Sequence, residues 1–173
     1  MIKHAYLIMA HNDPYVFHKL VSLLDDERND IFVHIDKKAD FSQFNDVKTE
    51  KSNLYFTDRI DNRWGAFTQI KTELLLFRTA RKHGHYGRYH LLSGVDLPLK
   101  TQDEIHDFFD AHADKEFIGF TPQSANADIR YKTSYYHIFL KYYKNKRYGI
   151  QFAARMVHIL FVDFQKLFQI HRH

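Results

Sequence analysis

The sequence predicts an α/β fold in which a mostly parallel sheet carries helices on both faces. Two apolar runs, residues 5–10 and 31–35, have the length of buried strands, and a helical repeat of apolar residues lies between them. Strand, helix and strand within about 30 residues are typical of a right-handed βαβ unit with parallel strands. A third run, residues 89–92, ends in a Ser-Gly turn followed by the carboxylate of Asp96. Open α/β sheets place ligand chemistry at such strand ends.

The first strand and the helix after it have clear end signals. The run at 5–10 stops at His11. Pro14 follows where a first helical residue should stand, with Asn12 or Asp13 as the N-cap. Apolar residues then recur with helical spacing until an acidic cluster ends the helix. The apolar positions are Val16, Phe17, Leu20, Val21, Leu23 and Leu24, and the acidic ones are Asp25, Asp26 and Glu27.

The same patterns predict the remaining elements. Strands are expected at 53–57, 89–92 and 116–120, and helices at 66–82, 102–112 and 151–170, with 134–144 as a further helical segment. A capping box formed by Thr101 and Glu104 opens the helix at 102–112. The helix at 66–82 ends with cationic residues and Gly84, as helices commonly do.

Composition favours a cytoplasmic protein of one domain, or of one domain with an appendage. Of the 173 residues, 45% are hydrophobic, which is enough for a core. The absence of cysteine excludes disulfides and cysteine-ligated metals. The N-terminus lacks the layout of a secretion signal, and no apolar run approaches the roughly 20 residues of a membrane span.

Charge is distributed unevenly along the chain. Residues 1–129 hold 16 Lys and Arg against 20 Asp and Glu, whereas residues 130–173 hold 9 against Asp163 alone. The basic segment is also rich in tyrosine and phenylalanine. A basic, aromatic segment suits an anionic membrane surface or a phosphate-rich ligand. The alternative is an amphipathic helix pair whose basic face is simply solvated.

Three predicted strand ends converge on one edge of the sheet. They carry His11, Asp36 and the segment 93–96, and this edge is the usual ligand crevice of an open α/β sheet. Asp36 is placed to accept hydrogen bonds from the base or ribose of a nucleoside. Alternatively, Asp36 caps a turn, and Asp96 bonds its own backbone in a turn.

Several function classes lack their motifs. The chain has no glycine-rich dinucleotide or P-loop pattern and no G-x-S-x-G nucleophile elbow. The close pairs His34-x-Asp36 and His83-x-His85 do not match a zinc spacing. An Asp-x-Asp motif for a metal-bound diphosphate is absent after the strand at 89–92. No metal site is therefore expected.

Four blocks of the sequence resemble the core-2/I-branching enzymes, glycosyltransferase family 14. They are residues 5–11, residues 31–38, the Arg-Trp-Gly-Ala-Phe-Thr block at 63–68 with the helix after it, and residues 89–101. The resemblance covers about residues 4–120. It implies a GT-A-like, Rossmann-type domain that binds a UDP-sugar and is expected to span residues 1–122. Residues 123–173 are expected to form a basic, aromatic helical segment, the start of an incomplete C-terminal half.

The resemblance also implies a chemistry. The family inverts the anomeric carbon of a UDP-sugar, here expected to be UDP-N-acetylglucosamine, and transfers the sugar to a glycan or cell-surface polysaccharide without a divalent metal or another cofactor. By position, His11 and Asp36 are donor-nucleotide contacts. The same pocket is shaped by Trp64 and by Ser93, Gly94 and Asp96.

One departure from the family concerns the catalytic base. The family's glutamate belongs to a Pro-Asp-Glu segment, and a basic diphosphate clamp lies beyond it; neither occurs in these 173 residues. The chain is therefore expected to be the donor-binding half of a longer enzyme and a poor catalyst alone, with residues 130–173 against the inner membrane face. The alternative is a non-catalytic nucleotide-sugar-binding module that works with a second chain. RNA-binding motifs are absent, so no nucleic-acid partner is expected.

Overall fold

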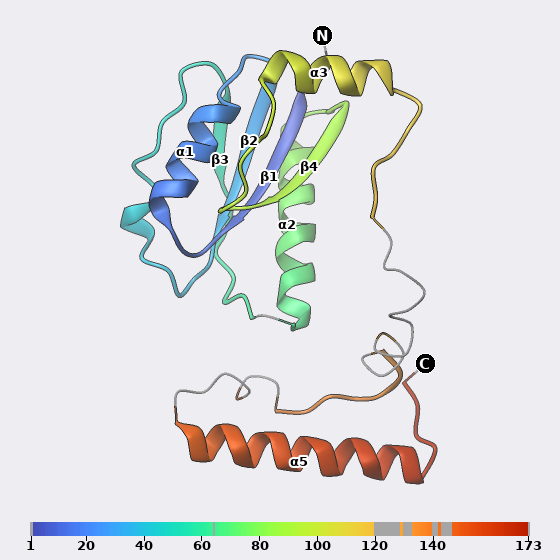
Figure 1. Cartoon of the computed structure of the whole chain (residues 1–173). Coiled ribbons are helices and arrows are strands. Elements are labelled where there is room, and N and C mark those ends of the chain that lie inside the picture. The colour runs from blue at the N-terminus through green and yellow to red at the C-terminus, as the bar shows by residue number, and fades with distance from the viewer. Residues whose placement is uncertain are drawn as a thin grey trace. The chain divides into compact units, whose positions relative to one another are not determined.

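A four-stranded parallel sheet organises the first part of the chain (Figure 1). The computed structural model describes residues 2–63, 65–119, 129, 133–139, 142 and 147–172. The strands are β1 (His4–Ala10), β2 (Asn29–Ile35), β3 (Asn53–Phe56) and β4 (Arg88–Ser93), in the sheet order β3-β2-β1-β4. The chain separates into two compact units, Met1–Asp114 and Lys115–His173, which are described separately below.

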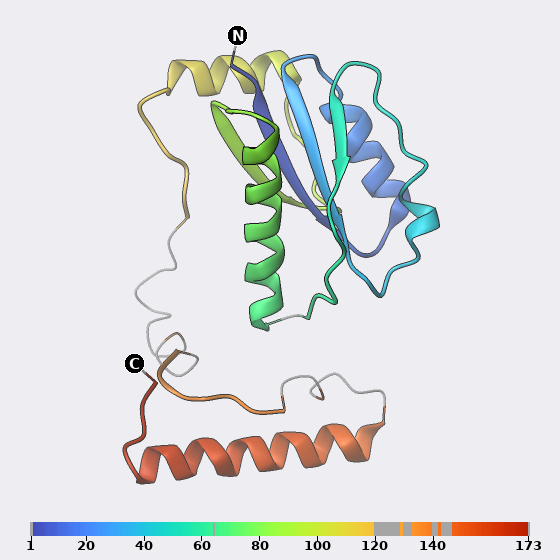
Figure 2. The same ribbon diagram turned by 180° about the vertical axis from the view of Figure 1, so that it is seen from behind.

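Alternation of side chains along β1 builds two cores, one on each face of the sheet. Tyr6 and Ile8 are buried on the face of α1 (Pro14–Leu24), and Ala5 and Leu7 are buried on the face of α2 (Phe67–His83). Figure 2, the view from behind, shows α2 on the face opposite to α1. Because both faces are covered, β1 and β2 are buried along nearly their whole length, and their central residues form continuous apolar runs rather than an alternating pattern. The predicted α/β fold with helices on both faces is confirmed.

The start of α1 follows the predicted end signals. Asp13 is the N-cap, and its carboxylate accepts a hydrogen bond from the backbone N–H of Val16 at 3.2 Å. Its φ of 51° is in the left-handed region, which lets the chain turn sharply from β1 into the helix. Pro14 occupies the first helical turn, as predicted.

The helix α3 (Gln102–Ala111) begins with the predicted capping box and packs on the amino-terminal ends of the strands. Its His106 stacks on His4 of β1 with ring centroids 4.1 Å apart. His90 of β4 approaches His4 with its Nε2 atom 3.2 Å from Nδ1. The Nε2 atom of His106 lies 3.0 Å from Oδ1 of Asn29, at the start of β2. We call His4, His90 and His106 the histidine cluster; it joins α3 to the start of β1 and to β4.

Burial keeps the histidine cluster neutral. Desolvation, reinforced by the neighbouring imidazoles, lowers the pKa of His4 to about 3. Burial likewise lowers the pKa of His90 to about 4 and lowers that of His106. Uncharged rings can pack against one another here without mutual repulsion.

The second unit contains α5 (Tyr148–Leu167), and residues 136–138 lie alongside it. The prediction of a helix at 134–144 is wrong at residues 135–139, which are not helical; residues 140, 141, 143 and 144 lie outside the described part. The physical reason is the side chain of Gln165. Its amide accepts from the N–H of Tyr136 at 2.8 Å and donates to the carbonyl of the same residue at 2.9 Å. These bonds replace the backbone partners that a helix would supply.

The predicted fifth strand at 116–120 is also wrong for residues 116–119, which form no strand; residue 120 lies outside the described part. Phe117 and Ile118 are exposed. An apolar run becomes a strand only where a neighbouring strand accepts its backbone hydrogen bonds, and the residue pattern does not reveal that partner.

Candidate active site

Strand register brings the ends of β1, β2 and β4 together at the carboxyl-terminal edge of the sheet. Ala10 pairs with Ile35 of β2, and Met9 pairs with Ser93 of β4. The backbone N–H of Asp36 then donates to the carbonyl of Ala10 at 2.9 Å. His11, Asp36 and Ser93 therefore follow neighbouring strands at one edge, as predicted.

The position of β1 makes this edge a topological switch point. The chain moves from β1 to β2 and β3 on one side, and then crosses to β4 on the other. In open α/β sheets the connections diverge at this point and leave a crevice for a ligand. Both α1 and α2 begin at this edge (Figure 1), so the positive ends of two helix dipoles point toward it.

Asp36 is buried, with 6% of its surface exposed, and is held in one orientation. Its Oδ1 atom accepts from the backbone N–H of Lys38 at 2.8 Å, and its Oδ2 atom lies 3.1 Å from the Lys38 ammonium group. The turn-capping role considered as an alternative therefore exists. An ionised carboxylate offers about four acceptor sites, so these two contacts leave capacity for ligand hydroxyl groups.

The loop after β3 forms one wall of the same edge. The imidazole of His34 accepts from the N–H of Ile60 at 2.9 Å, and the N–H of Lys37 donates to the carbonyl of Ile60 at 3.1 Å. Arg59 donates to the carbonyls of Asp36 at 2.7 Å and of Ala39 at 2.6 Å. Burial lowers the pKa of His34, which favours the neutral ring, and the hydrogen bond from Ile60 N–H identifies Nε2 as the nitrogen without a proton.

Sequence reasoning missed both of these positioning residues. His34 and Arg59 act on the backbone around Asp36 rather than through a motif of their own. The one available signal for His34 was a polar side chain within an apolar strand. For Arg59, in a polar loop, the sequence contains no such signal.

A chain of alternating charges extends from Asp36 across this loop. Lys38 lies 2.8 Å from Asp61, which lies 2.8 Å from Arg63, and Lys38 also donates to the carbonyl of Asn62. The hydrogen bond from Arg63, followed by that from Lys38, lowers the pKa of Asp61 to about 2. Desolvation opposes the charge on Lys38, but the bonds to Asp61 and Asp36 outweigh it and raise the pKa of its ammonium group. Lys38 is thus fixed beside Asp36, and Arg63 is joined to it through Asp61.

The turn after β4 is tightly built. The carboxylate of Asp96 accepts from the N–H of Ser93 at 2.7 Å, so the alternative of a turn-forming aspartate is observed here as well. Gly94 donates its N–H to the carbonyl of Met9 at 2.8 Å. A Cβ atom on Gly94 would lie 2.5 Å from the Cβ of Ala10, so only glycine permits this approach. Gly94 thus has a packing role; its contact with a donor stays a prediction.

Of the two other predicted contacts, the structure describes His11 alone. His11 is exposed directly after β1. Trp64 lies outside the described residues. Its neighbours are held by the first turn of α2, where Arg63 donates its N–H to Thr68 at 2.9 Å and Gly65 donates its N–H to Gln69 at 2.7 Å.

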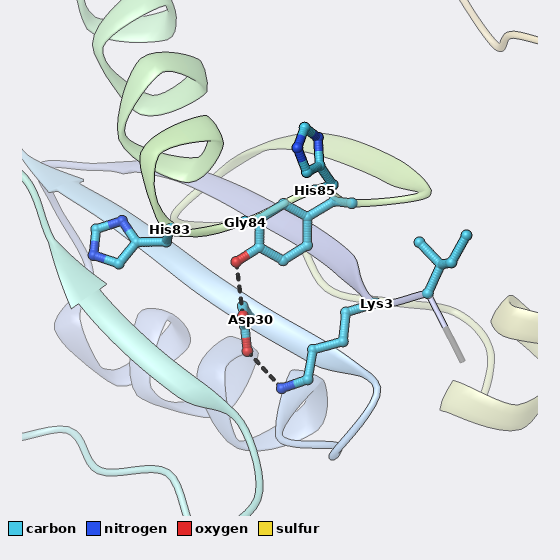
Figure 3. A pocket seen from close by; sticks show the side chains of 7 residues that line it. Lys3, Asp30, His83, Gly84 and His85 are labelled. Atoms are coloured by element: carbon cyan, nitrogen blue, oxygen red, sulfur yellow. Dashed lines mark hydrogen bonds and ion pairs between the residues drawn. The ribbon is translucent and has the colours of Figure 1, made fainter.

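Two hollows formed by described residues lie near the opposite, amino-terminal edge. The first, about 370 Å³, is lined by Lys3, Asp30, His83 and their neighbours (Figure 3). The carboxylate of Asp30 in this hollow already accepts three hydrogen bonds from the protein, from Lys3 at 2.8 Å, from Asn53 at 2.9 Å and from Tyr86 at 2.7 Å. The second hollow is lined by charged side chains: Asp26, Glu27, Arg28, Lys51 and Asp103. Neither coincides with the edge that carries Asp36.

Comparison with known proteins agrees with the blocks described above. The family model of the Core-2/I-Branching enzyme matches residues 4–156, which is most of the chain. Among curated proteins, none matches the chain. The matched span includes all four strands, and it includes His11, Asp36 and the turn at 93–96. The chain belongs to the core-2/I-branching enzyme family, whose members are glycosyltransferases.

Proposed function

We propose that this chain binds the donor of an inverting, metal-independent glycosyltransferase that uses a UDP-sugar, with N-acetylglucosamine as the expected sugar. The acceptor is a glycan or a cell-surface polysaccharide. The observation that carries the proposal is Asp36, a buried and oriented carboxylate at the switch-point edge of the sheet. A buried acid in this position is suited to accept hydrogen bonds from the ribose or uracil of a nucleotide.

The charges around Asp36 support a diphosphate next to the nucleoside. Lys38 and Arg63 are fixed at the same edge by Asp61, and the amino-terminal ends of α1 and α2 add positive potential. Cationic groups and helix N-termini stabilise the negative charge that a departing diphosphate acquires. The proposed role of this edge is therefore to hold the donor and to receive the leaving group.

The proposed reaction is a single in-line displacement. A carboxylate base takes the proton of an acceptor hydroxyl while its oxygen attacks C1 of the sugar, and the bond from C1 to the diphosphate breaks. Glu104 is unsuited to this role, because its carboxylate accepts from Thr101 N–H at 3.0 Å and from Lys100 at 2.9 Å. We assign no base among these residues and propose that they bind donor and transfer sugar slowly.

Calorimetric titration with UDP tests the proposal. Saturable binding that is equal in EDTA and in manganese supports it, and binding that requires manganese refutes metal independence. We expect Asp36→Ala to weaken UDP binding by about 1–2 kcal/mol, or about 5- to 30-fold, the loss of one or two hydrogen bonds.

Asp40→Ala is the matched control for that variant. Asp40 also caps a turn, and its Oδ1 atom accepts from the N–H of Ser42 at 3.1 Å, the same two-residue spacing as in Asp36 and Lys38. Loss of a turn cap alone should therefore affect both variants. Equal UDP affinity in Asp36→Ala and Asp40→Ala would remove Asp36 from the site.

A further inference from the structure

The helix α5 exposes the side that a helix in water normally buries. Its buried residues are Ala154, His158, Val162 and Gln165, of which two are polar. Large apolar side chains occupy most of the opposite side of the helix, where Leu160 and Leu167 are 63% and 77% exposed. We call this surface the α5 apolar face; it consists of Phe152, Met156, Val157, Ile159, Leu160, Phe164 and Leu167.

Hydrogen bonds account for the buried side of α5. Gln165 bonds both backbone groups of Tyr136, and the Nδ1 atom of His158 lies 3.1 Å from the carbonyl of Ile138. The segment of residues 136–138 therefore covers the polar side of the helix (Figure 2). The α5 apolar face lies on the side of the helix opposite to these contacts.

The α5 apolar face spans about half of the helix circumference at 100° per residue. Arg155 and Lys166 lie at one margin of this arc. Asp163, the one acidic residue on the helix, lies within this arc between Phe152 and Met156, and its carboxylate is balanced by the ammonium group of Lys166 at 2.9 Å. An apolar face with cationic residues at its margin is the pattern of helices that lie in the interface of a membrane.

The charge of the surrounding segment identifies the kind of surface. Residues 130–173 contain 9 lysines and arginines and a single acid, Asp163. A second copy of the chain would bring the same positive charge against itself, whereas an anionic surface complements it. Charge and apolar exposure therefore favour the same partner.

We propose that α5 lies in the interface of an anionic lipid bilayer, with the α5 apolar face among the acyl chains and with Arg155 and Lys166 at the headgroups. Such binding combines burial of apolar area with attraction to anionic lipid, so it requires both features. The polar side of α5 remains bound to residues 136–138 and faces away from the acyl chains. This placement concerns the second unit alone and is independent of the proposed donor site.

Vesicle co-sedimentation of the full chain tests the proposal. We expect binding to vesicles of phosphatidylcholine and phosphatidylglycerol (3:1) to exceed binding to pure phosphatidylcholine by about tenfold or more at low salt, and to weaken in 0.5 M NaCl. Leu160→Glu should reduce binding by about tenfold. Leu99→Glu is the matched control, because Leu99 is 97% exposed in the first unit and the substitution changes the net charge equally.

A fluorescence measurement distinguishes insertion from simple electrostatic adhesion. Leu160→Trp should shift its emission to the blue and be quenched by brominated acyl chains when anionic vesicles are added, with the parent chain, which has one tryptophan, as the reference. Equal binding by Leu160→Glu and Leu99→Glu would overturn the proposal. So would a concentration-dependent dimer that Leu160→Glu dissociates in the absence of vesicles, since the occupant would then be a second copy.

Discussion

Lowering the pH from 7.5 to 5 should destabilise the first unit through the histidine cluster. Burial holds the pKa of His4 at about 3 and that of His90 at about 4, whereas both return to about 6.5 in the unfolded chain. Between these values the unfolded chain binds protons that the folded chain does not. The free energy of unfolding therefore decreases as the pH falls below about 6.5.

The size of this loss of stability is set by protonation of the histidines in the unfolded chain, because the folded rings stay neutral. At pH 5, about 1.5 units below 6.5, each fully neutral histidine reduces stability by about 2 kcal/mol, so His4 and His90 together account for about 4 kcal/mol. Both rings remain largely neutral in the folded chain at pH 5, because their pKa values lie below it. The pKa of His106 is lowered as well, so it acts in the same direction. Because domains are stable by about 5–15 kcal/mol, the loss is large.

Carboxylates do not obscure the measurement in this pH range. The pKa of Asp26 is lowered to about 2 by its hydrogen bond with Arg28, from an ordinary value of 3.8. A depressed carboxylate pKa reduces stability only as the pH approaches and falls below the unfolded value. Its contribution at pH 5 is therefore small, and the window from 7.5 to 5 reports on histidines.

Urea denaturation followed by far-ultraviolet circular dichroism at both pH values measures the loss. His90→Phe should reduce it by about 2 kcal/mol, since Phe removes one titrating group. Phe also preserves the ring that stacks on Tyr6, with centroids 4.6 Å apart. His85→Asn replaces an exposed histidine as a control. Equal stability at pH 7.5 and 5, or an unchanged pH dependence in His90→Phe, would refute the reasoning.

Two further substitutions test the elements that position the site. Gly94→Ala should lower stability by about 1–3 kcal/mol, because its Cβ would lie 2.5 Å from the Cβ of Ala10, and it should weaken UDP binding by displacing the turn. Thermal denaturation measures the stability and calorimetric titration the affinity. A variant with wild-type stability would contradict the packing role of Gly94. Thr101→Ala should lower stability by about 1 kcal/mol, because it removes the Thr101 hydroxyl that accepts from Glu104 N–H at 3.3 Å in the capping box. UDP affinity should not change. A change in affinity would contradict the inference that this cap supports the fold and not the donor site.

Local rules predicted the elements whose signals are contained within a few residues. Asp13 and Pro14 mark the start of α1, and Thr101 with Glu104 marks the start of α3, because caps are short-range hydrogen bonds. Two predictions that needed a distant partner were wrong. The run at 116–119 forms no strand, and residues 135–139 are not helical, with residues 136–138 bonded to α5 instead.

The location of the candidate site could be predicted from the sequence, but the side chains that hold its loops in place could not. Register at the sheet edge follows from parallel strands, and this placed His11, Asp36 and Ser93 correctly at one edge. The supports of that edge could not be predicted, because His34 and Arg59 bind backbone atoms 20 or more residues away. Backbone groups look alike in any sequence, so only the folded chain reveals which of them a side chain will meet.

The two aspartates at this edge are now distinguishable by their surroundings. Both cap turns, but Asp96 is exposed whereas Asp36 is buried and paired with Lys38. A buried carboxylate must be balanced by fixed cations and donors, and these hold it in one orientation before a ligand arrives. An exposed carboxylate exchanges with water and gains less from each new hydrogen bond. The larger effect on donor binding is therefore expected from Asp36, and substitution of Asp96 should act mainly through the turn that it closes.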